Sequence, residues 1–317
     1  MLSKKSILAF ALLLLPALAT AQNAPDWTEP FPPHRVVANV YYVGSKGLAS
    51  YLITTPQGHI LINGSMEANV PLIRESVEKL GFRFTDVKIL LISHAHWDHC
   101  AGSARVKELT GAQYMVMDGD VPVVESGGKA DFQYGHSPDN LYKPAKVDRT
   151  LHDGDEVKLG EVKRGGVVLV AHKTPGHTKG CTTWTMKVPA SGQIVGGPMD
   201  GSKTLDVVIV GSPNVNPGYK LVNNIAYPQI AQDYEQTFRV LKALPCDIFL
   251  GAHGSYYDME EKFARLKSEM KQEPEMKQEK EAANNPFIDP QGYNHYIADR
   301  DQAFREELHK QQAATHP

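Results

Sequence analysis

The sequence lacks the features that mark nucleic-acid-binding and membrane-spanning proteins. Its 33 lysines and arginines are outnumbered by 36 aspartates and glutamates, and a net charge of -3 provides no basic surface for a phosphate backbone. The one long apolar run, at residues 7–18, is shorter than the roughly 20 residues that span a bilayer. Cysteine is scarce as well, and three cysteines leave at least one without a disulfide partner. We therefore expect neither nucleic acid nor a membrane as a partner.

The apolar run near the N-terminus has the pattern of an export signal. Lys4 and Lys5 precede it, and the small residues Ala-Thr-Ala at 19–21 follow as a cleavage pattern. We expect removal of residues 1–21, a mature chain at 22–317 that begins with Gln22, and a periplasmic location in a Gram-negative source. The mature chain is long enough for one large domain with an ample core.

Apolar periodicity predicts strands and helices in alternation along the mature chain. Strands are expected at residues 36–43, 48–55, 59–63, 87–92, 114–117, 153–159, 166–172, 181–188, 205–211 and 247–251, and helices at residues 70–80, 101–109, 230–244, 259–280 and 293–311. Residues 118–147 form a long segment of little periodicity, which in a compact domain is usually functional or mobile. The alternation favours an α/β sandwich with two central sheets and helices outside, one domain with its site along one edge.

A short stretch at 93–102, S-H-A-H-W-D-H-C-A-G, contains four strong metal-binding side chains within six positions: His94, His96, Asp98 and His99. It follows a predicted buried strand and precedes a predicted helix, so its irregular backbone lets neighbouring side chains point at different targets. His94 and His96, two apart in extended chain, project to the same side and can bind one ion. Asp98 and His99 come after the chain turns and can reach a second ion. Three or four ligands with one open position are what a hydrolytic zinc ion requires.

Three further predicted strand ends each present a polar residue, namely His177 in T-P-G-H-T, Ser212 and His253. Because residue types that commonly bind metals follow strand ends throughout the chain, we expect one site along the edge of the sheets. His136 and His152 are assigned ordinary loop roles instead.

Together, H-A-H-W-D-H at 94–99, P-G-H-T at 175–178 and G-A-H at 251–253 resemble the metallo-β-lactamase fold. Further stretches are similar to the third subclass of that family: N-G-S-M-E-A-N at 63–69, S-P-N-V-N-P-G-Y-K-L at 212–221 and L-P-C-D-I-F-L-G-A-H at 244–253. The resemblance covers nearly the whole mature chain. It implies a four-layer αβ/βα sandwich with a C-terminal helix.

The resemblance also implies two zinc ions and their ligands. His94, His96 and His177 look like the ligands of the first zinc ion, and Asp98, His99 and His253 like those of the second. Ser212 stands where other subclasses carry a cysteine ligand, and Cys100 and Cys181 are poor ligand candidates. Ser212 and Asn216 look placed to hold the carboxylate of a substrate.

Two zinc ions a few ångströms apart would lower the pKa of a shared water from about 15.7 to roughly 7 or below. The resulting hydroxide, oriented by Asp98, would attack a lactam carbonyl, with no serine nucleophile. The resemblance thus implies an exported enzyme that opens the β-lactam ring of penicillins, cephalosporins and carbapenems and gives antibiotic resistance. We expect it to act as a monomer.

The fold alone does not determine the substrate, because the same scaffold supports other hydrolytic reactions. Glyoxalase-like and nuclease-like relatives place a bridging aspartate where this chain has Ser212, which argues against them. An exported hydrolase of lactones or other esters is the main enzymatic alternative. A zinc-binding protein without catalysis is the alternative from another class, but it would fill its coordination sphere with protein ligands.

One cysteine departs from the pattern of the family. Family members often pair the cysteine equivalent to Cys246 with one in the C-terminal segment, and Tyr293 occupies that neighbourhood here. We therefore expect Cys246 to be unpaired and buried, and Cys100 and Cys181 to be small buried residues with free thiols.

Overall fold

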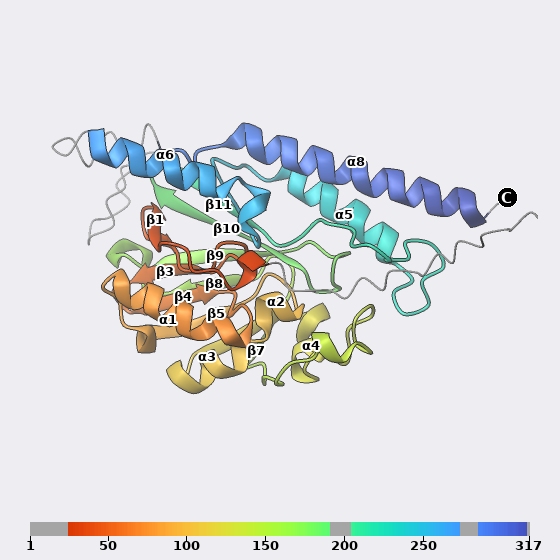
Figure 1. Cartoon of the computed structure of the whole chain (residues 1–317), viewed down its shortest axis with the longest axis horizontal. Helices are drawn as coiled ribbons and strands as arrows, with labels where there is room; N and C mark the ends of the chain where they lie inside the picture. The colour runs from red at the N-terminus through yellow and green to blue at the C-terminus, as the bar shows by residue number, and fades with distance from the viewer. Residues whose placement is uncertain (1–24, 191–203, 273–284, 316–317) are drawn as a thin grey trace, which may run out of the picture.

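Two β-sheets lie at the centre of the molecule, with helices on both outer sides (Figure 1). The computed structural model describes residues 25–190, 204–272 and 285–315. This architecture confirms the expected α/β sandwich with helices outside. The expected signal peptide at residues 1–21 and the start at Gln22 lie outside the described residues.

The first sheet has seven strands that pair in chain order: β1 (His34–Val37), β2 (Val40–Tyr42), β3 (Tyr51–Thr55), β4 (Gly58–Ile62), β5 (Val87–Leu91), β6 (Gln113–Met117) and β7 (Arg149–Leu151). The strands from β1 to β4 form an antiparallel meander, and those from β4 to β7 are parallel. In β4, Ile60 and Ile62 pack in the core that includes the second sheet, whereas Leu61 packs in the core under the helices. Because both faces are covered there, every residue of β4 is buried.

The second sheet has five strands: β8 (Glu156–Leu159), β9 (Val167–Lys173), β10 (Thr182–Pro189), β11 (Thr204–Val210) and β12 (Ile248–Gly251). Their order is β12-β11-β10-β9-β8. Neighbours are antiparallel except β11 and β12, which run parallel because helix α5 (Ile230–Ala243) carries the chain back between them. Strands β5, β11 and β12 therefore all end near one edge, and the candidate site residues come directly after these strand ends.

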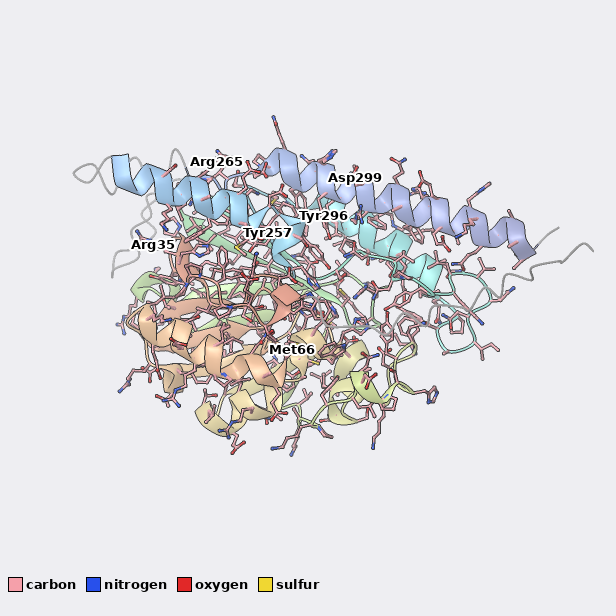
Figure 2. The ribbon with its side chains drawn as sticks, viewed as in Figure 1. Arg35, Met66, Tyr257, Arg265, Tyr296 and Asp299 are labelled. Atoms are coloured by element: carbon pink, nitrogen blue, oxygen red, sulfur yellow. The ribbon has the colours of Figure 1, made fainter. Side chains whose placement is uncertain are left out.

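Helices α1 (Val70–Lys79) and α3 (Ser103–Thr110) cover the first sheet, and α5, α6 (Met259–Gln272) and α8 (Pro290–Thr315) cover the second (Figure 1). Buried Ile297 and Phe304 dock α8 as expected. In Figure 2, Tyr257 and Tyr296 lie on the side of the sheets, whereas the exposed Arg265 and Asp299 lie on the outer side of the helices. No helix within the described residues is both long and apolar enough to cross a membrane.

The remaining helices within the described residues are short. Two of these are α-helical, α2 (Trp97–Cys100) and α4 (Val121–Glu125). The 3-10 helices span Pro25–Trp27, Glu67–Asn69, Phe84–Asp86, Asp118–Asp120, Pro138–Asn140, Val162–Arg164 and Gly254–Tyr256.

Most differences from the predicted elements concern short segments. The predictions missed β7 and α4, which have three and five residues and carry too little periodicity to be recognised. The helix expected at 101–109 is α3, shifted to 103–110 behind the one-turn α2. The part of the helical run 259–280 beyond Gln272 lies outside the described residues. All three cysteines are free, and Cys100 and Cys181 are buried as expected.

The prediction that Cys246 is buried is wrong. This cysteine is unpaired, but it is only partly buried, because it lies two residues before β12 begins and belongs to the connection that leaves α5. Tyr293, in the neighbourhood where a partner cysteine was considered, is buried and donates its hydroxyl to the carbonyl of Leu241 at 2.6 Å. The docking of α8 near this point therefore uses a tyrosine hydrogen bond and no disulfide.

Candidate metal centre

Hydrogen bonds join the ends of the two sheets directly behind the residues that could bind metal. The indole Nε1 of Trp184 donates to the carbonyl of Ile92 at 3.0 Å, and the amide of Thr182 donates to the carbonyl of Ser93 at 2.8 Å. Asn63, at the end of β4, fixes Ser93 further by accepting its amide at 2.8 Å. The loop that begins at His94 thus leaves β5 at a point held by both sheets.

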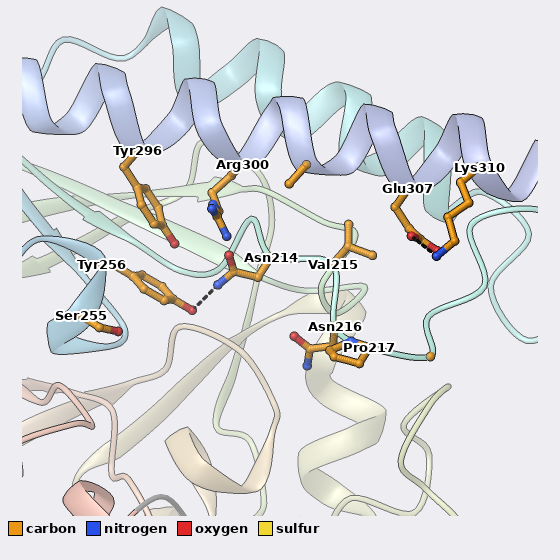
Figure 3. Close-up of a pocket in the computed structure, with 12 residues that line it drawn as sticks. Asn214, Val215, Asn216, Pro217, Ser255, Tyr256, Tyr296, Arg300, Glu307 and Lys310 are labelled. Atoms are coloured by element: carbon orange, nitrogen blue, oxygen red, sulfur yellow. Dashed lines mark hydrogen bonds and ion pairs between the residues drawn. The ribbon is translucent and has the colours of Figure 1, made fainter. Parts of the chain in front are cut away.

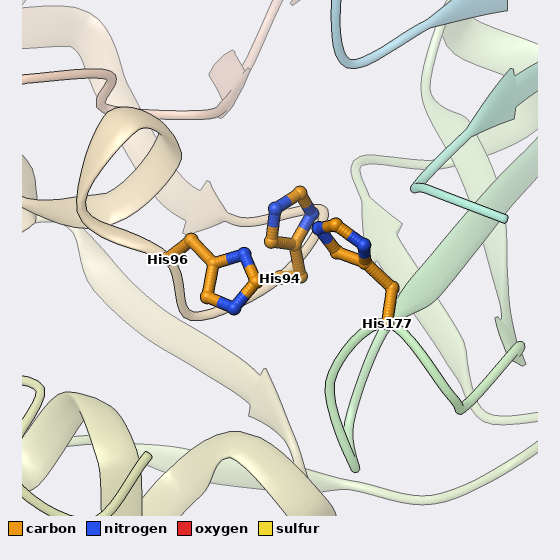
Figure 4. Close-up of side chains that lie close together, drawn as sticks. All are labelled: His94, His96 and His177. Atoms are coloured by element: carbon orange, nitrogen blue, oxygen red, sulfur yellow. The ribbon is translucent and has the colours of Figure 1, made fainter. Parts of the chain in front are cut away.

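Three histidine rings converge in front of this point (Figure 4). One ring nitrogen each from His94, His96 and His177 can be chosen so that all lie within 4.8 Å of one another, and the three side chains are buried. The Nδ1 of His177 lies 2.8 Å from the carbonyl oxygen of Asn214. Since a carbonyl accepts, that nitrogen carries the proton and Nε2 is left free as a ligand. These three residues are called the first triad below.

Asp98, His99 and His253 form a second triad beside the first. The Oδ2 of Asp98 lies 3.0 Å from the Nε2 of His99 and 3.5 Å from the Nε2 of His253, and the two histidine nitrogens lie 3.1 Å apart. The spacing is a closed triangle of one carboxylate oxygen and two imidazole nitrogens. Asp98 and His99 come from α2, and His253 from the end of β12.

The protonation states of four residues in this cluster favour metal binding. Burial, together with the neighbouring imidazoles, lowers the pKa of His94 and His177 well below the usual value, and lowers that of His253 to about 4. Burial alone would raise the pKa of Asp98, but His99 and His253 hold it well below its usual value. Neutral imidazoles and an ionised carboxylate are the forms that coordinate a cation.

The triads also fit zinc by the chemistry of their donors. Five imidazoles and one carboxylate converge, and the Nε2 of His99 faces both Asp98 and His253. Nitrogen and carboxylate ligands in sets of three are typical of catalytic zinc, which keeps a position open.

A buried carboxylate that the sequence analysis missed ties the two loops of the first triad together. Asp120 accepts the amide of Ala95 and the hydroxyl of Thr178 on Oδ2, and the amide of Gly180 on Oδ1, each at 2.8 Å. Burial raises its pKa to about 6. The signal that could have found it is its place in D-G-D directly after strand β6, another strand end.

The long segment 118–147 supplies a second missed carboxylate. Asp131 accepts the amides of Gln133 and Tyr134 on Oδ1 at 2.8 and 2.6 Å. Its Oδ2 lies 3.6 Å from the Nε2 of His96. Burial opposes protonation of His96, yet this carboxylate raises the pKa of the ring. The segment therefore reaches the centre itself.

A cavity of about 380 Å³ opens beside both triads. It is lined by Trp27, His96, Trp97, Asp98, Tyr134, Asn140, His177, Asn214, Asn216, His253, Ser255 and Tyr256. Asn216 faces this cavity and donates to the hydroxyl of Tyr134 at 3.0 Å. Ser212 is buried behind the lining, with its Oγ 3.2 Å from the hydroxyl of Tyr256. His136 and His152 are exposed and take no part in either triad.

Comparison with known proteins identifies the family. The family model of the metallo-β-lactamase superfamily matches residues 47–188. The native FEZ-1 metallo-β-lactamase from Legionella gormanii is 50% identical, over 90% of this chain and 98% of that one, with a TM-score of 0.79. BJP-1, a subclass B3 metallo-β-lactamase of Bradyrhizobium japonicum, is 35% identical, over 92% of this chain and 98% of that one, with a TM-score of 0.76.

Two further relatives are more distant. The metallo-β-lactamase GOB-18 from Elizabethkingia meningoseptica is 32% identical, over 92% of this chain and 97% of that one, with a TM-score of 0.77. A probable metallo-hydrolase of Burkholderia pseudomallei is 30% identical over 110 residues, which are 35% of this chain and 34% of that relative. The chain thus spans about a third of the length of this curated relative, but nearly all of the solved structures. By its two triads, its two-sheet fold and these likenesses, the chain belongs to the subclass B3 metallo-β-lactamases.

Proposed function

We propose that this protein is an exported zinc-dependent hydrolase that opens the β-lactam ring of penicillins, cephalosporins and carbapenems. The observation that supports this most strongly is the pair of triads beside one cavity, in a chain 50% identical to a metallo-β-lactamase over nearly its whole length. Export to the periplasm rests on the basic, apolar and small-residue pattern of residues 1–21. We further propose that the enzyme acts as a monomer.

Each triad would hold one zinc ion, the first through His94, His96 and His177 and the second through Asp98, His99 and His253. Zinc bound there supplies a water of lowered pKa as a nucleophile and a Lewis acid for the lactam carbonyl. Because three protein ligands per ion leave a position open, the arrangement favours a catalytic role over a purely structural one.

The residues of the chain contribute orientation and exclusion of water. Asp98 stays ionised at neutral pH and lines the cavity, so its carboxylate can accept a hydrogen bond from the attacking water and direct its lone pair at the carbonyl carbon. Trp27 and Trp97, whose ring centroids lie 5.6 Å apart, form an aromatic wall for the apolar substituents of a substrate.

The amide of Asn216 is placed to bind polar groups of the substrate. It gives one N–H to Tyr134 and lines the cavity, so we propose that its second N–H donates to the substrate. Ser212 lies one layer deeper and would act on the substrate through Tyr256 and Asn214, which both hydrogen-bond with it. We propose that these groups hold the carboxylate of the substrate and contribute to binding more than to the chemical step.

A zinc-dependence assay on three substrates tests the proposal. The purified protein is stripped with a chelator, reloaded with zinc, and assayed on a penicillin, a carbapenem and a simple lactone. We expect β-lactam hydrolysis to vanish without zinc and to return when two zinc ions per chain are restored. Rapid opening of the lactone with intact β-lactams would assign the second candidate function, the hydrolysis of lactones or other esters.

Export is tested separately by N-terminal sequencing of periplasmic protein. A mature start at Gln22 is expected, and recovery of protein that still begins at Met1 would contradict export with cleavage.

A further inference from the structure

A second and larger cavity, of about 880 Å³, lies between the loop at 214–218 and helix α8 (Figure 3). It is lined by Asn214, Val215, Asn216, Pro217, Gly218, Ser255, Tyr256, Tyr296, Arg300, Ala303, Glu307 and Lys310. Four of these residues, Asn214, Asn216, Ser255 and Tyr256, also line the cavity of the metal centre. The two cavities therefore adjoin along these four residues.

Arg300 differs from the other cations of α8 in its contacts. Its Nε is buried, has no hydrogen-bond partner among the described residues, and the guanidinium lies 5.9 Å from the ring centroid of Tyr296. By contrast, Arg305 pairs with Asp301 at 2.9 Å, and Lys310 pairs with Glu307 at 3.1 Å. The hydrogen-bonding capacity of Arg300 is thus not fully met within the cavity wall.

The charged residues that line this cavity favour an anion as its ligand. Arg300 and Lys310 carry two positive charges and Glu307 one negative charge, which leaves the lining with a net charge of +1. A guanidinium presents planar, paired donors that match the two oxygens of a carboxylate, and burial of such donors without an acceptor costs free energy. The apolar Val215, Pro217 and Ala303 provide surface for the hydrocarbon part of the same group.

We propose that this cavity is an anion subsite, in which Arg300 binds a carboxylate of the substrate while the lactam ring lies at the triads. The inference rests on the proposed β-lactam hydrolysis, and it specifies which substrates the enzyme favours. The carboxylate comes either from an acidic acyl substituent, beside a ring carboxylate held by Asn216, or from the ring system that all penicillins share, in which case Arg300 replaces Asn216 in that role. Arg300 binds substrate in this scheme and takes no part in the chemical step.

Two penicillins that differ by one carboxylate distinguish these sources. Benzylpenicillin and carbenicillin share the bicyclic ring, and carbenicillin carries an added carboxylate on the acyl side chain. With Arg300→Gln, we expect KM for carbenicillin to rise about tenfold, the size of one lost charge-assisted hydrogen bond, while kcat is maintained. An increase for carbenicillin alone assigns the side-chain carboxylate, and an equal increase for both substrates assigns the ring carboxylate.

The matched control is Arg305→Gln, which removes the same charge from the same helix outside the cavity. It should leave both KM values unchanged, and thermal melting of both variants should match that of the wild-type protein. Unchanged KM values for Arg300→Gln with both penicillins, in an enzyme that hydrolyses them, would overturn the anion subsite and leave the proposed function intact.

A binding measurement separates the subsite from catalysis. The zinc-loaded protein is titrated calorimetrically with phenylmalonate, a dicarboxylate, and with phenylacetate, which has one carboxylate. In the wild-type protein and in Arg305→Gln, phenylmalonate should bind more tightly than phenylacetate. In Arg300→Gln that advantage should fall about tenfold. The same advantage in Arg300→Gln as in wild type would refute the subsite, even if no β-lactam were hydrolysed.

Discussion

The two metal triads differ in what holds their ligands in place. The loops of the first triad are joined by one buried carboxylate, Asp120, which bonds to the residues that follow His94 and His177. Among the described residues, no buried carboxylate joins the loops of the second triad in this way. Its His253 is held through the N-terminal part of the chain, by a bridge to Leu48 and by the ring of Trp27 at 5.9 Å. The first site is thus fixed from the interior, and the second is completed by a segment that packs over it.

The triads also differ in charge and exposure. The first has three buried imidazoles and no carboxylate among its ligands, whereas the second contains Asp98 and a partly exposed His253, at 18%. An ion in the second triad gains from a negative charge, and it lies closer to solvent. This difference predicts that substitutions will affect the two ions separately.

The largest effect is expected for Asp98→Asn, which keeps the shape of the side chain and removes the only charge in the second triad. The second zinc ion should dissociate first, and the attacking water loses its orienting acceptor. We expect kcat/KM to fall by more than the roughly 10–100-fold typical of a lost supporting residue. Zinc counting by native mass spectrometry should find the first ion retained. Near-normal turnover of penicillins would contradict the role assigned to Asp98.

Asp120→Asn makes the same chemical change behind the first triad. An asparagine places an NH₂ group where one carboxylate oxygen accepts, so at least one of the three donors on the two loops loses its acceptor. We expect affinity for the first zinc ion to fall by about 10–100-fold, with the second ion less affected. Competition with a chromogenic chelator measures both affinities. If the affinities for both zinc ions fell equally, the two triads would not be supported independently.

Trp27→Ala should have a smaller effect, confined to the second triad and the cavity wall. Loss of the ring contacts with His253 and Trp97 should weaken the second zinc ion and raise KM by a few-fold, in keeping with about 1 kcal/mol per aromatic contact. Trp27→Phe keeps a ring and serves as the control. Steady-state kinetics at saturating and at limiting zinc separate the two effects. A change in kcat alone would place Trp27 in a different role.

The comparison of triads also explains which residues the sequence could predict. His94, His96, Asp98 and His99 lie within six positions, so their spacing alone indicates a metal site. Asp120 and Asp131 lie more than 20 residues further along, and only the packing of the segment 118–147 brings them to the histidines. The depth of Ser212 below Tyr256 depends likewise on how the loop after β11 folds over it. The alternation of predicted strands and helices along the chain indicated both sheets, whereas three-residue β7 gave no pattern.

The smallest effect on activity is expected for a substitution of His34. This substitution tests acid unfolding independently of metal loss. His34 is buried among aromatic rings far along the sheet from the triads, and burial lowers its pKa from 6.5 to about 4. Between these values the unfolded chain binds a proton that the folded chain does not, so its contribution to stability is present above pH 6.5 and is lost as the pH falls toward 4.

His34→Gln cannot take up that proton, and its amide can still donate to the carbonyl of Pro32. Relative to this variant, the wild-type protein should lose about 2 kcal/mol of unfolding free energy between pH 7 and pH 5. Urea unfolding of both zinc-free proteins at the two pH values measures the difference without metal loss. Activity at pH 7 should be the same in both. Parallel losses of stability in the two proteins would show that His34 does not titrate on unfolding, and would leave the triads as the source of acid sensitivity.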